Sequence, residues 1–256
     1  MQLATLYLGN YSRHYYALEP KMGSVMDGSA HHLESSTQGI GSSVEPHLGE
    51  RPLVQRALKR LFDILGALAG LVFLSPALLT IAILIKIQDK GPAIFAHTRI
   101  GKDGAPFKCY KFRSMVIDAP QRLEALLAAD PDAAAEWARD QKLRNDPRIT
   151  TFGRFLRRSS LDELPQLINI LRGDMSIVGP RPIIKDEVRR YGADFEAYKS
   201  VRPGVTGLWQ VSGRNDVSYD QRVQLDARYA RHWSVLGDIW ITLKTVPAVL
   251  LSRGAS

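Results

Sequence analysis

The amino-acid sequence predicts a mostly helical α+β protein, in which a re-entrant membrane helix precedes a small cytoplasmic domain that contains a β-hairpin. The main observation is an apolar run without any charged residue from Ile64 to Ile85. A helix of about 22 residues, with a rise of about 1.5 Å per residue, is long enough to cross a hydrocarbon core of roughly 30 Å. Beyond this run, two extended segments around a turn are followed by segments with helical periodicity.

The composition indicates a folded chain with an anionic partner. Hydrophobic residues make up 45% of the 256 residues and charged residues 23%, which is typical of a globular protein. The net charge of +8 suits a nucleic acid, a phosphate-bearing substrate or an acidic lipid surface. The single cysteine, Cys109, excludes an internal disulfide framework, and we expect it to be a packing residue.

The chain divides into three parts. Residues 1–50 are rich in Gly, Ser and His and have no sustained period, which predicts a disordered tail. Residues 51–90 contain the membrane helix. Residues 91–256 have the mixed composition of a membrane-associated domain.

A break near the middle of the apolar run favours a helix that enters and leaves the membrane on one face. Pro76 has no N–H to donate to the Val72 carbonyl and its ring kinks the helix, while the Ser75 hydroxyl is placed to satisfy the freed backbone groups. Positive charge at both ends favours two cytoplasmic ends. These flanking residues are Arg56, Lys59 and Arg60 before the run, and Lys86 and Lys90 after it. An unbroken spanning helix is the alternative.

The first segment after the membrane helix predicts a β-hairpin. Two extended runs between residues 94 and 115 meet at Lys102-Asp103-Gly104, a typical turn sequence. Alternate residues of a strand point to the same side, so Lys111 and Arg113 present two positive charges on one face. We therefore take both as candidates for binding a substrate phosphate.

Periodicity and capping residues predict the helices of the domain. Residues 121–145 break at Asp130-Pro131, an N-cap and first helical position, and a second helix runs to about residue 143. A helix in LDELPQLINIL stops at Gly173. Ser218 and Gln221 form a capping-box pattern for a helix that runs towards His232. The segment 233–251 suits a helix in the membrane interface, with a buried core helix as the alternative.

Two adjacent carboxylates, Asp162 and Glu163, follow Arg157 and Arg158. One interpretation is structural, because Ser160-x-x-Glu163 fits a capping box and acids are ordinary in a first helical turn. Pro165 argues against it, since a helix capped by Ser160 would lose a backbone bond there. A helix that begins nearer Asp162 leaves the carboxylates at an exposed elbow, where N–H groups and guanidiniums hold a phosphate beside a carboxylate.

Two further segments have ligand-binding character. Arg181 lies between Pro180 and Pro182, so its stiff backbone loses little entropy when the guanidinium binds a phosphate. A surface loop without a ligand is the alternative for this segment. The glycines of residues 203–216 suit tight turns or close approach to a ligand, and Trp209 offers a stacking face. A glycine-rich hairpin with a buried Trp is the alternative for this segment.

These segments together resemble the bacterial sugar transferase family, the monotopic phosphoglycosyl transferases. The resemblance runs from about Arg51 to the C-terminus and includes KFRSM at 111–115, SLDELPQLINILRGDMSIVGPRP at 160–182 and PGVTGLWQVSGRND at 203–216. The insert LAADPDAAAEWARDQKLRNDPRIT and the ending KTVPAVLLSRGAS look most like the galactose-type branch, which initiates exopolysaccharide synthesis.

The resemblance implies the transfer of a hexose-1-phosphate, with galactose-1-phosphate favoured, from a UDP-sugar to undecaprenyl phosphate, with release of UMP. It implies that Asp162 attacks the β-phosphate and binds Mg²⁺, while Glu163 assists the acceptor phosphate or the metal. It further implies a bacterial inner membrane protein whose catalytic domain is on the cytoplasmic face. The cations expected to offset substrate phosphate charge are Arg157, Arg181, Lys111 and Arg113.

Other functions remain open at this point. The same reaction with UDP-glucose or a UDP-N-acetylhexosamine fits the residues equally, and a non-catalytic membrane scaffold of polysaccharide assembly is a different class. The intact Asp162, Glu163, Arg157 and Arg181 argue against the scaffold. Nucleic-acid binding is disfavoured by the apolar run and by the absence of a nucleic-acid motif. Self-association as a homodimer is left open.

Overall fold

The structure is a computed structural model that describes residues 51–140, 142–213 and 217–250. The predicted tail, residues 1–50, lies outside the described residues. The order of elements is α2 (Leu53–Asp89), β1 (Ile94–Ile100), η1 (Lys102–Gly104), β2 (Pro106–Phe112), α3 (Ala119–Ala129), α4 (Pro131–Asp140), α5 (Thr151–Arg158), η2 (Leu161–Glu163), α6 (Gln166–Arg172), β3 (Ser176–Val178), η3 (Lys185–Glu187), α7 (Val188–Tyr191), η4 (Gly192–Asp194), α8 (Phe195–Lys199), β4 (Gly204–Thr206), α9 (Leu208–Val211), α10 (Tyr219–His232) and α11 (Val235–Leu250). The described part is therefore a mostly helical α+β fold, as predicted.

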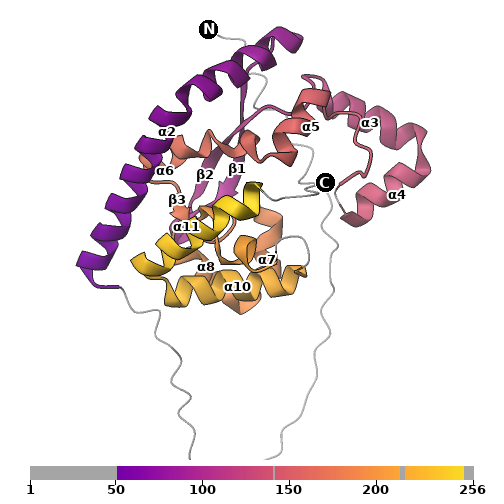
Figure 1. Cartoon of the computed structure of the whole chain (residues 1–256). Coiled ribbons are helices and arrows are strands. Elements are labelled where there is room, and N and C mark those ends of the chain that lie inside the picture. Colours follow the sequence, from indigo (N-terminus) through magenta and orange to yellow (C-terminus); the bar gives the residue numbers. More distant parts are fainter. Residues whose placement is uncertain (1–50, 141, 214–216, 251–256) are drawn as a thin grey trace, which may run out of the picture. The chain divides into compact units, whose positions relative to one another are not determined.

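Helix α2 is the one described helix that is long and apolar enough to cross a membrane. Its most apolar stretch has a mean hydropathy of 2.5 and is only 11% buried, so it is not the core helix of a water-soluble domain. Pro76 lies inside the helix, and the Ser75 hydroxyl donates to the Val72 carbonyl at 2.8 Å. This confirms that Ser75 satisfies the carbonyl that Pro76 leaves free. The ribbon of α2 changes direction part-way along (Figure 1), and its exposed apolar surface indicates membrane association.

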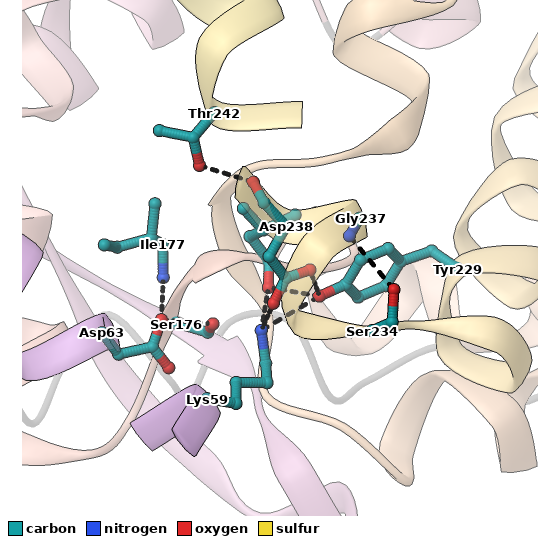
Figure 2. A network of polar contacts seen from close by, with 10 residues as sticks. Lys59, Asp63, Ser176, Ile177, Tyr229, Ser234, Gly237, Asp238 and Thr242 are labelled. Carbon is teal, nitrogen blue, oxygen red and sulfur yellow. Dashed lines mark hydrogen bonds and ion pairs between the residues drawn. The ribbon is translucent and has the colours of Figure 1, made fainter. Parts of the chain in front are cut away.

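The first half of α2 is fastened to the domain by buried charges. Lys59 forms an ion pair with Asp238 of α11 and also donates to the Tyr229 hydroxyl at 3.0 Å (Figure 2). One turn further, the Asp63 carboxylate accepts hydrogen bonds from the Ser176 hydroxyl and from a backbone N–H of β3. Lys59 and Asp63 are both buried in the domain.

The predicted hairpin is confirmed. Strands β1 and β2 pair antiparallel around the turn, in which Asp103 (φ 59°) and Gly104 (φ 75°) adopt the left-handed region. The register pairs Phe95 with Lys111 and His97 with Cys109, so these side chains lie on one face. Cys109 is 1% exposed, which confirms its role in packing.

A second, parallel pair of strands was not predicted. Strands β3 and β4 pair Ser176 with Gly204 and Val178 with Thr206. The backbones come so close that a Cβ on Gly204 would lie 2.1 Å from the Gly179 nitrogen. We expected the glycines of this segment to serve tight turns or the approach of a ligand. Gly204 instead permits close contact between β4 and the backbone after β3.

The cap predictions for the helices are confirmed, with one difference in length. The Asp130 carboxylate accepts from the N–H groups of Asp132 and Ala133 at the start of α4. That helix ends at Asp140, earlier than the predicted residue 143. Ser218 and Gln221 form the capping box of α10, which ends at His232.

The last helix, α11, has one buried face, as a core helix would, and one exposed apolar face. One face is buried against the domain, with Asp238 fully buried and Ile241 4% exposed. The other face exposes large apolar side chains, with Leu236 79%, Leu243 68% and Trp240 48% exposed. The exposed face therefore suits a membrane interface, while the buried face holds α2.

Candidate active site

The two adjacent carboxylates lie in a short turn of their own between α5 and α6. Ser160 adopts a left-handed conformation (φ 56°) and its side chain makes no cap, so the capping-box interpretation is wrong. Helix α6 begins only after Pro165, because proline has no N–H and suits the start of a helix. The expected elbow is present, but Asp162 is only 8% exposed. The expectation of exposed carboxylates is therefore wrong for Asp162.

Asp162 is a buried carboxyl group in a positively charged setting. Burial raises its pKa from 3.8 to about 6, although Lys111 and Arg157 oppose the rise. The nearby Glu163 carboxylate adds to it. Desolvation is thus a larger effect on this pKa than the neighbouring positive charges. At neutral pH most molecules still carry the carboxylate that a nucleophile requires.

The pKa of Glu163 is shifted in the opposite direction to that of Asp162. Its Oε1 accepts from Lys111 Nζ at 2.6 Å. Burial acts to raise the pKa of Glu163, but Lys111 outweighs it with help from Arg181, and the net pKa is lowered. Adjacent acids whose pKa values are pushed apart have different chemical tasks in known active sites. Glu163 is thus a permanent anion that holds Lys111 beside Asp162.

Arg157 is positioned by the packing of α5. Its Nε donates to the Ser114 hydroxyl at 2.8 Å, and Ser114 is buried. A Cβ on Gly153 would lie 2.0 Å from the Ser114 carbonyl oxygen. The close approach of α5 to this backbone therefore requires glycine at position 153. Burial lowers the pKa of Arg157, and the nearby Asp162 carboxylate opposes that change.

Arg181 joins the same cluster from the loop after β3. Its guanidinium carbon lies 6.0 Å from the centre of the Trp209 ring. Its charge contributes to the lowered pKa of Glu163. The aromatic face that we expected to stack on a ligand therefore contacts a cation of the protein.

Arg113 makes its contacts at the end of α2, and its binding of a substrate phosphate stays a prediction. Its guanidinium binds the Asp89 carboxylate at the end of α2 through two hydrogen bonds, and its Nε donates to the Pro92 carbonyl at 2.7 Å. Strand β2 ends at Phe112, one residue before Arg113. Arg113 thus fastens the second end of the membrane helix.

Arg99 is a further candidate site residue, which no sequence motif had indicated. It lies on β1, on the same face as Lys111, and contributes to the lowered pKa of Glu163. Its Nη1 lies 3.8 Å from a Glu187 carboxylate oxygen and donates to the Pro182 carbonyl at 3.3 Å. The hairpin register, applied from the turn outward, would have found it.

The site fits a divalent cation that takes most of its ligands from substrate. Within the described ranges no group of three or more His, Cys, Asp or Glu residues is placed to hold a metal. No described side chain donates a hydrogen bond to the Asp162 carboxylate. A buried carboxylate beside cations, which accepts a hydrogen bond from its own backbone but from no described side chain, suits Mg²⁺. This ion is bound by one or two carboxylates plus phosphate oxygens and water.

The chain is similar to known sugar transferases over most of its length. The family model for bacterial sugar transferases matches residues 54–252. A UDP-galactose-lipid carrier transferase of Erwinia amylovora is 53% identical over 200 residues, which cover 78% of this chain and 42% of the relative. The exopolysaccharide production protein ExoY of Rhizobium meliloti is 51% identical over 197 residues, which cover 77% of this chain and 87% of the relative. A UDP-glucose:undecaprenyl-phosphate glucose-1-phosphate transferase of Escherichia coli is 42% identical over 210 residues, which cover 79% of this chain and 42% of the relative. The chain thus spans less than half of two of these relatives and most of the third.

Proposed function

Because the chain belongs to the bacterial sugar transferase family, we propose that it transfers a hexose-1-phosphate from a UDP-sugar to undecaprenyl phosphate. The products are UMP and undecaprenyl-diphosphate-sugar, the first intermediate of an exopolysaccharide repeat unit. The observation that carries this proposal is the buried Asp162 carboxylate between Arg157 and the Lys111–Glu163 ion pair. A scaffold does not need a desolvated carboxylate with a raised pKa among cations.

Galactose-1-phosphate is the favoured group. Two relatives whose names specify UDP-galactose or galactose are 53% and 55% identical to this chain and a galactosyl transferase is 44% identical, whereas two relatives named for glucose are 42% and 36% identical. The same reaction with glucose or an N-acetylated hexosamine is the alternative, because no described side chain distinguishes an axial from an equatorial hydroxyl.

The reaction proceeds in two displacements. A carboxylate oxygen of Asp162 bonds to the β-phosphorus of the donor, and the bond from this phosphorus to the bridging oxygen of UMP breaks, so the electron pair leaves with UMP. An oxygen of undecaprenyl phosphate then attacks the same phosphorus and releases the Asp162 carboxylate. One site thereby serves a water-soluble donor and a lipid acceptor in turn. Asp162, assisted by Glu163, would hold Mg²⁺, which when bound neutralises phosphate charge.

The cations of the chain lower the charge repulsion between Asp162 and the donor. Lys111 is held at the carboxylates by Glu163, and Arg157 is held by Ser114, so neither must be ordered during the reaction. Preorganised positive charge of this kind costs no rearrangement when the transition state forms. Arg181, half-buried against Trp209, completes the set on the Glu163 side.

A donor panel tests the proposal. The full chain, in detergent or nanodiscs with undecaprenyl phosphate and Mg²⁺, is expected to release UMP fastest from UDP-galactose. UDP-glucose and UDP-N-acetylglucosamine are expected to give slower release. Release of UMP from none of the donors would contradict the enzyme assignment and favour the scaffold. Faster release from UDP-glucose would retain the reaction and change the sugar.

The pH dependence of the first displacement follows from the raised pKa of Asp162. The rate of UMP release without acceptor is expected to fall as the pH drops through about 6, because protonated Asp162 is a poor nucleophile. Above that pH the carboxylate is ionised and the rate should level off. A single-turnover profile measures this directly. A rate that stayed constant down to pH 4.5 would show that ionisation of Asp162 does not limit the step.

The contacts of α2 support a re-entrant helix on the cytoplasmic face. Lys59 and Asp63 anchor its first half to the domain, and Asp89 anchors its other end to the same domain through Arg113. A straight spanning helix would separate these two ends by roughly 30 Å of hydrocarbon. The Ser75-Pro76 break is the point at which the helix turns back.

Thiol labelling in intact cells tests this topology. We expect Leu53→Cys and Ala105→Cys, each in a Cys109→Ser background, to resist an impermeant reagent because both positions are cytoplasmic. Replacing Ser75 and Pro76 together with Leu should straighten α2 and expose the cysteine at position 53 to the periplasm. Labelling at position 53 with the natural Ser75-Pro76 present would instead establish a spanning helix.

A further inference from the structure

Three arginines from separate elements lie around Glu187 and Trp209. Arg99 comes from β1, Arg181 from the loop after β3, and Arg222 from α10. The guanidinium carbons of Arg181 and Arg222 lie 6.0 Å and 5.7 Å from the centre of the Trp209 ring. Arg99 and Arg222 are largely buried, with side chains 16% and 14% exposed. The group is therefore a built feature of the domain and not a set of surface charges.

The described residues do not neutralise this group. Glu187 is its one ion-pair partner, at 3.8 Å from Arg99 and 3.5 Å from Arg222, and its Oε2 also accepts from a backbone N–H. Asp226 is fully buried nearby, and burial raises its pKa to about 7, so it supplies only part of a charge. The indole N–H of Trp209 is buried without a hydrogen-bond partner. Uncompensated cations and an unsatisfied donor both cost free energy, which an anionic ligand would recover.

The two arginines nearest the carboxylates repel each other. Burial lowers the pKa of Arg99, and the charge of Arg181 lowers it further. Both guanidiniums also help to lower the pKa of Glu163. By contrast, Arg157, which is bound to Ser114, acts to lower the pKa of Asp162. Arg99 and Arg181 are therefore the pair of arginines whose charges act on Glu163.

In the first displacement, these arginines would stabilise the negative charge of the leaving group. The leaving phosphate departs in line with the attacking oxygen of Asp162 and gains negative charge as its bond breaks. Charge of that kind is stabilised by guanidiniums, which bind phosphate oxygens through two hydrogen bonds. We propose that Arg99 and Arg181 together bind the α-phosphate of the donor, and that Arg99 stabilises the leaving UMP. This inference rests on the proposed function.

The competing explanation for Arg99 is structural. Its bond to the Pro182 carbonyl runs beside a backbone bond from Ile100 to Ile183, so it could simply fasten the hairpin to the Arg181 loop. The two explanations differ in what they predict for ligand binding. A phosphate contact affects the binding of UMP but not that of uridine, which lacks the phosphate, whereas a structural fastening that shapes the site affects both.

Arg99→Gln in the full chain, reconstituted in nanodiscs, separates them. We expect the affinity for UMP, measured by calorimetry and by reversal of the isolated sugar-phosphate adduct, to fall about tenfold or more. The affinity for uridine, which lacks the phosphate, should stay within about twofold of that of the natural chain. Arg99→Lys should bind UMP with intermediate affinity, since it keeps the charge but loses the planar guanidinium.

Arg189→Gln is the matched control, because Arg189 is an exposed arginine on α7. It should leave the affinities for UMP and for uridine unchanged. Unchanged UMP affinity in Arg99→Gln would overturn the inference while leaving the proposed function intact. An equal loss of affinity for UMP and for uridine, in Arg99→Gln and Arg99→Lys alike, would also overturn it in favour of structural fastening. A natural chain that neither binds UMP nor forms an adduct would overturn both proposals together.

Discussion

Asp162→Asn is expected to abolish the sugar-phosphate adduct and to lower turnover by about a thousandfold or more. The amide has nearly the same shape as the carboxylate but is a poor nucleophile, so neither displacement can pass through residue 162. Incubation of the natural chain with UDP-galactose and Mg²⁺, without acceptor, should leave added mass on the peptide that contains Asp162. The same experiment on Asp162→Asn should show none.

The variant should not lose activity through unfolding. The folded-state pKa of Asp162 is raised from 3.8 to about 6, so its ionisation in the folded protein costs up to about 3 kcal/mol above pH 6. That cost shrinks between pH 6 and 4 and is absent below pH 4, where the group is protonated in both states. Asn never bears the charge, so Asp162→Asn should be at least as stable at neutral pH.

Glu163→Gln is the informative comparison. It removes the partner of Lys111 but leaves the nucleophile, so it should be impaired and still form some adduct. Retained turnover in Asp162→Asn, or UMP release only when donor and acceptor are both bound, would replace the covalent route with direct transfer. Asp162 would then be a structural residue of the turn.

Lys59→Met is expected to destabilise the domain by about 3–5 kcal/mol, because it leaves the Asp238 carboxylate buried without its cation. Burial raises the pKa of Asp238, and the charge and hydrogen bond of Lys59 oppose that rise. Figure 2 shows that the Tyr229 hydroxyl binds the same carboxylate, which leaves it a hydrogen bond but no counter-charge. Thermal or denaturant unfolding in a fixed detergent measures the loss.

A double variant and a control make the measurement specific. Lys59→Met combined with Asp238→Leu should recover most of the stability, because it removes both charges together. Lys244→Met changes a lysine on the exposed face of α11 that lies 4.3 Å from the Trp240 ring, and it should cost no more than about 1 kcal/mol. A loss in Lys59→Met as small as the control would mean that the ion pair does not fasten α2.

The features that the sequence predicted correctly depend on residues within four positions of each other. The Ser75 hydroxyl on the Val72 carbonyl, the Asp130 cap of α4 and the Ser218–Gln221 box all close over three or four residues. The apolar run is likewise a property of consecutive side chains. Such interactions are decided by local backbone geometry, so their residue pattern is visible without the fold.

The features that only the tertiary structure decided join residues far apart in the chain. Asp63 meets Ser176, and Lys59 meets Asp238 across 179 positions. The three-residue strands β3 and β4 are too short to show alternation, and their pairing exists because Gly179 and Gly204 let two backbones approach.

The active site shows the same division. Motif resemblance identified Asp162, but the direction of its pKa shift depends on how much of the domain covers it. Arg113 was assigned to phosphate by strand alternation, and the structure shows that β2 ends one residue earlier and that Asp89, 24 positions away, binds the guanidinium. Arg99 entered the site only through the register of the hairpin. Residue types and local geometry are properties of the sequence, whereas desolvation and the distance between remote charges exist only once the chain has folded.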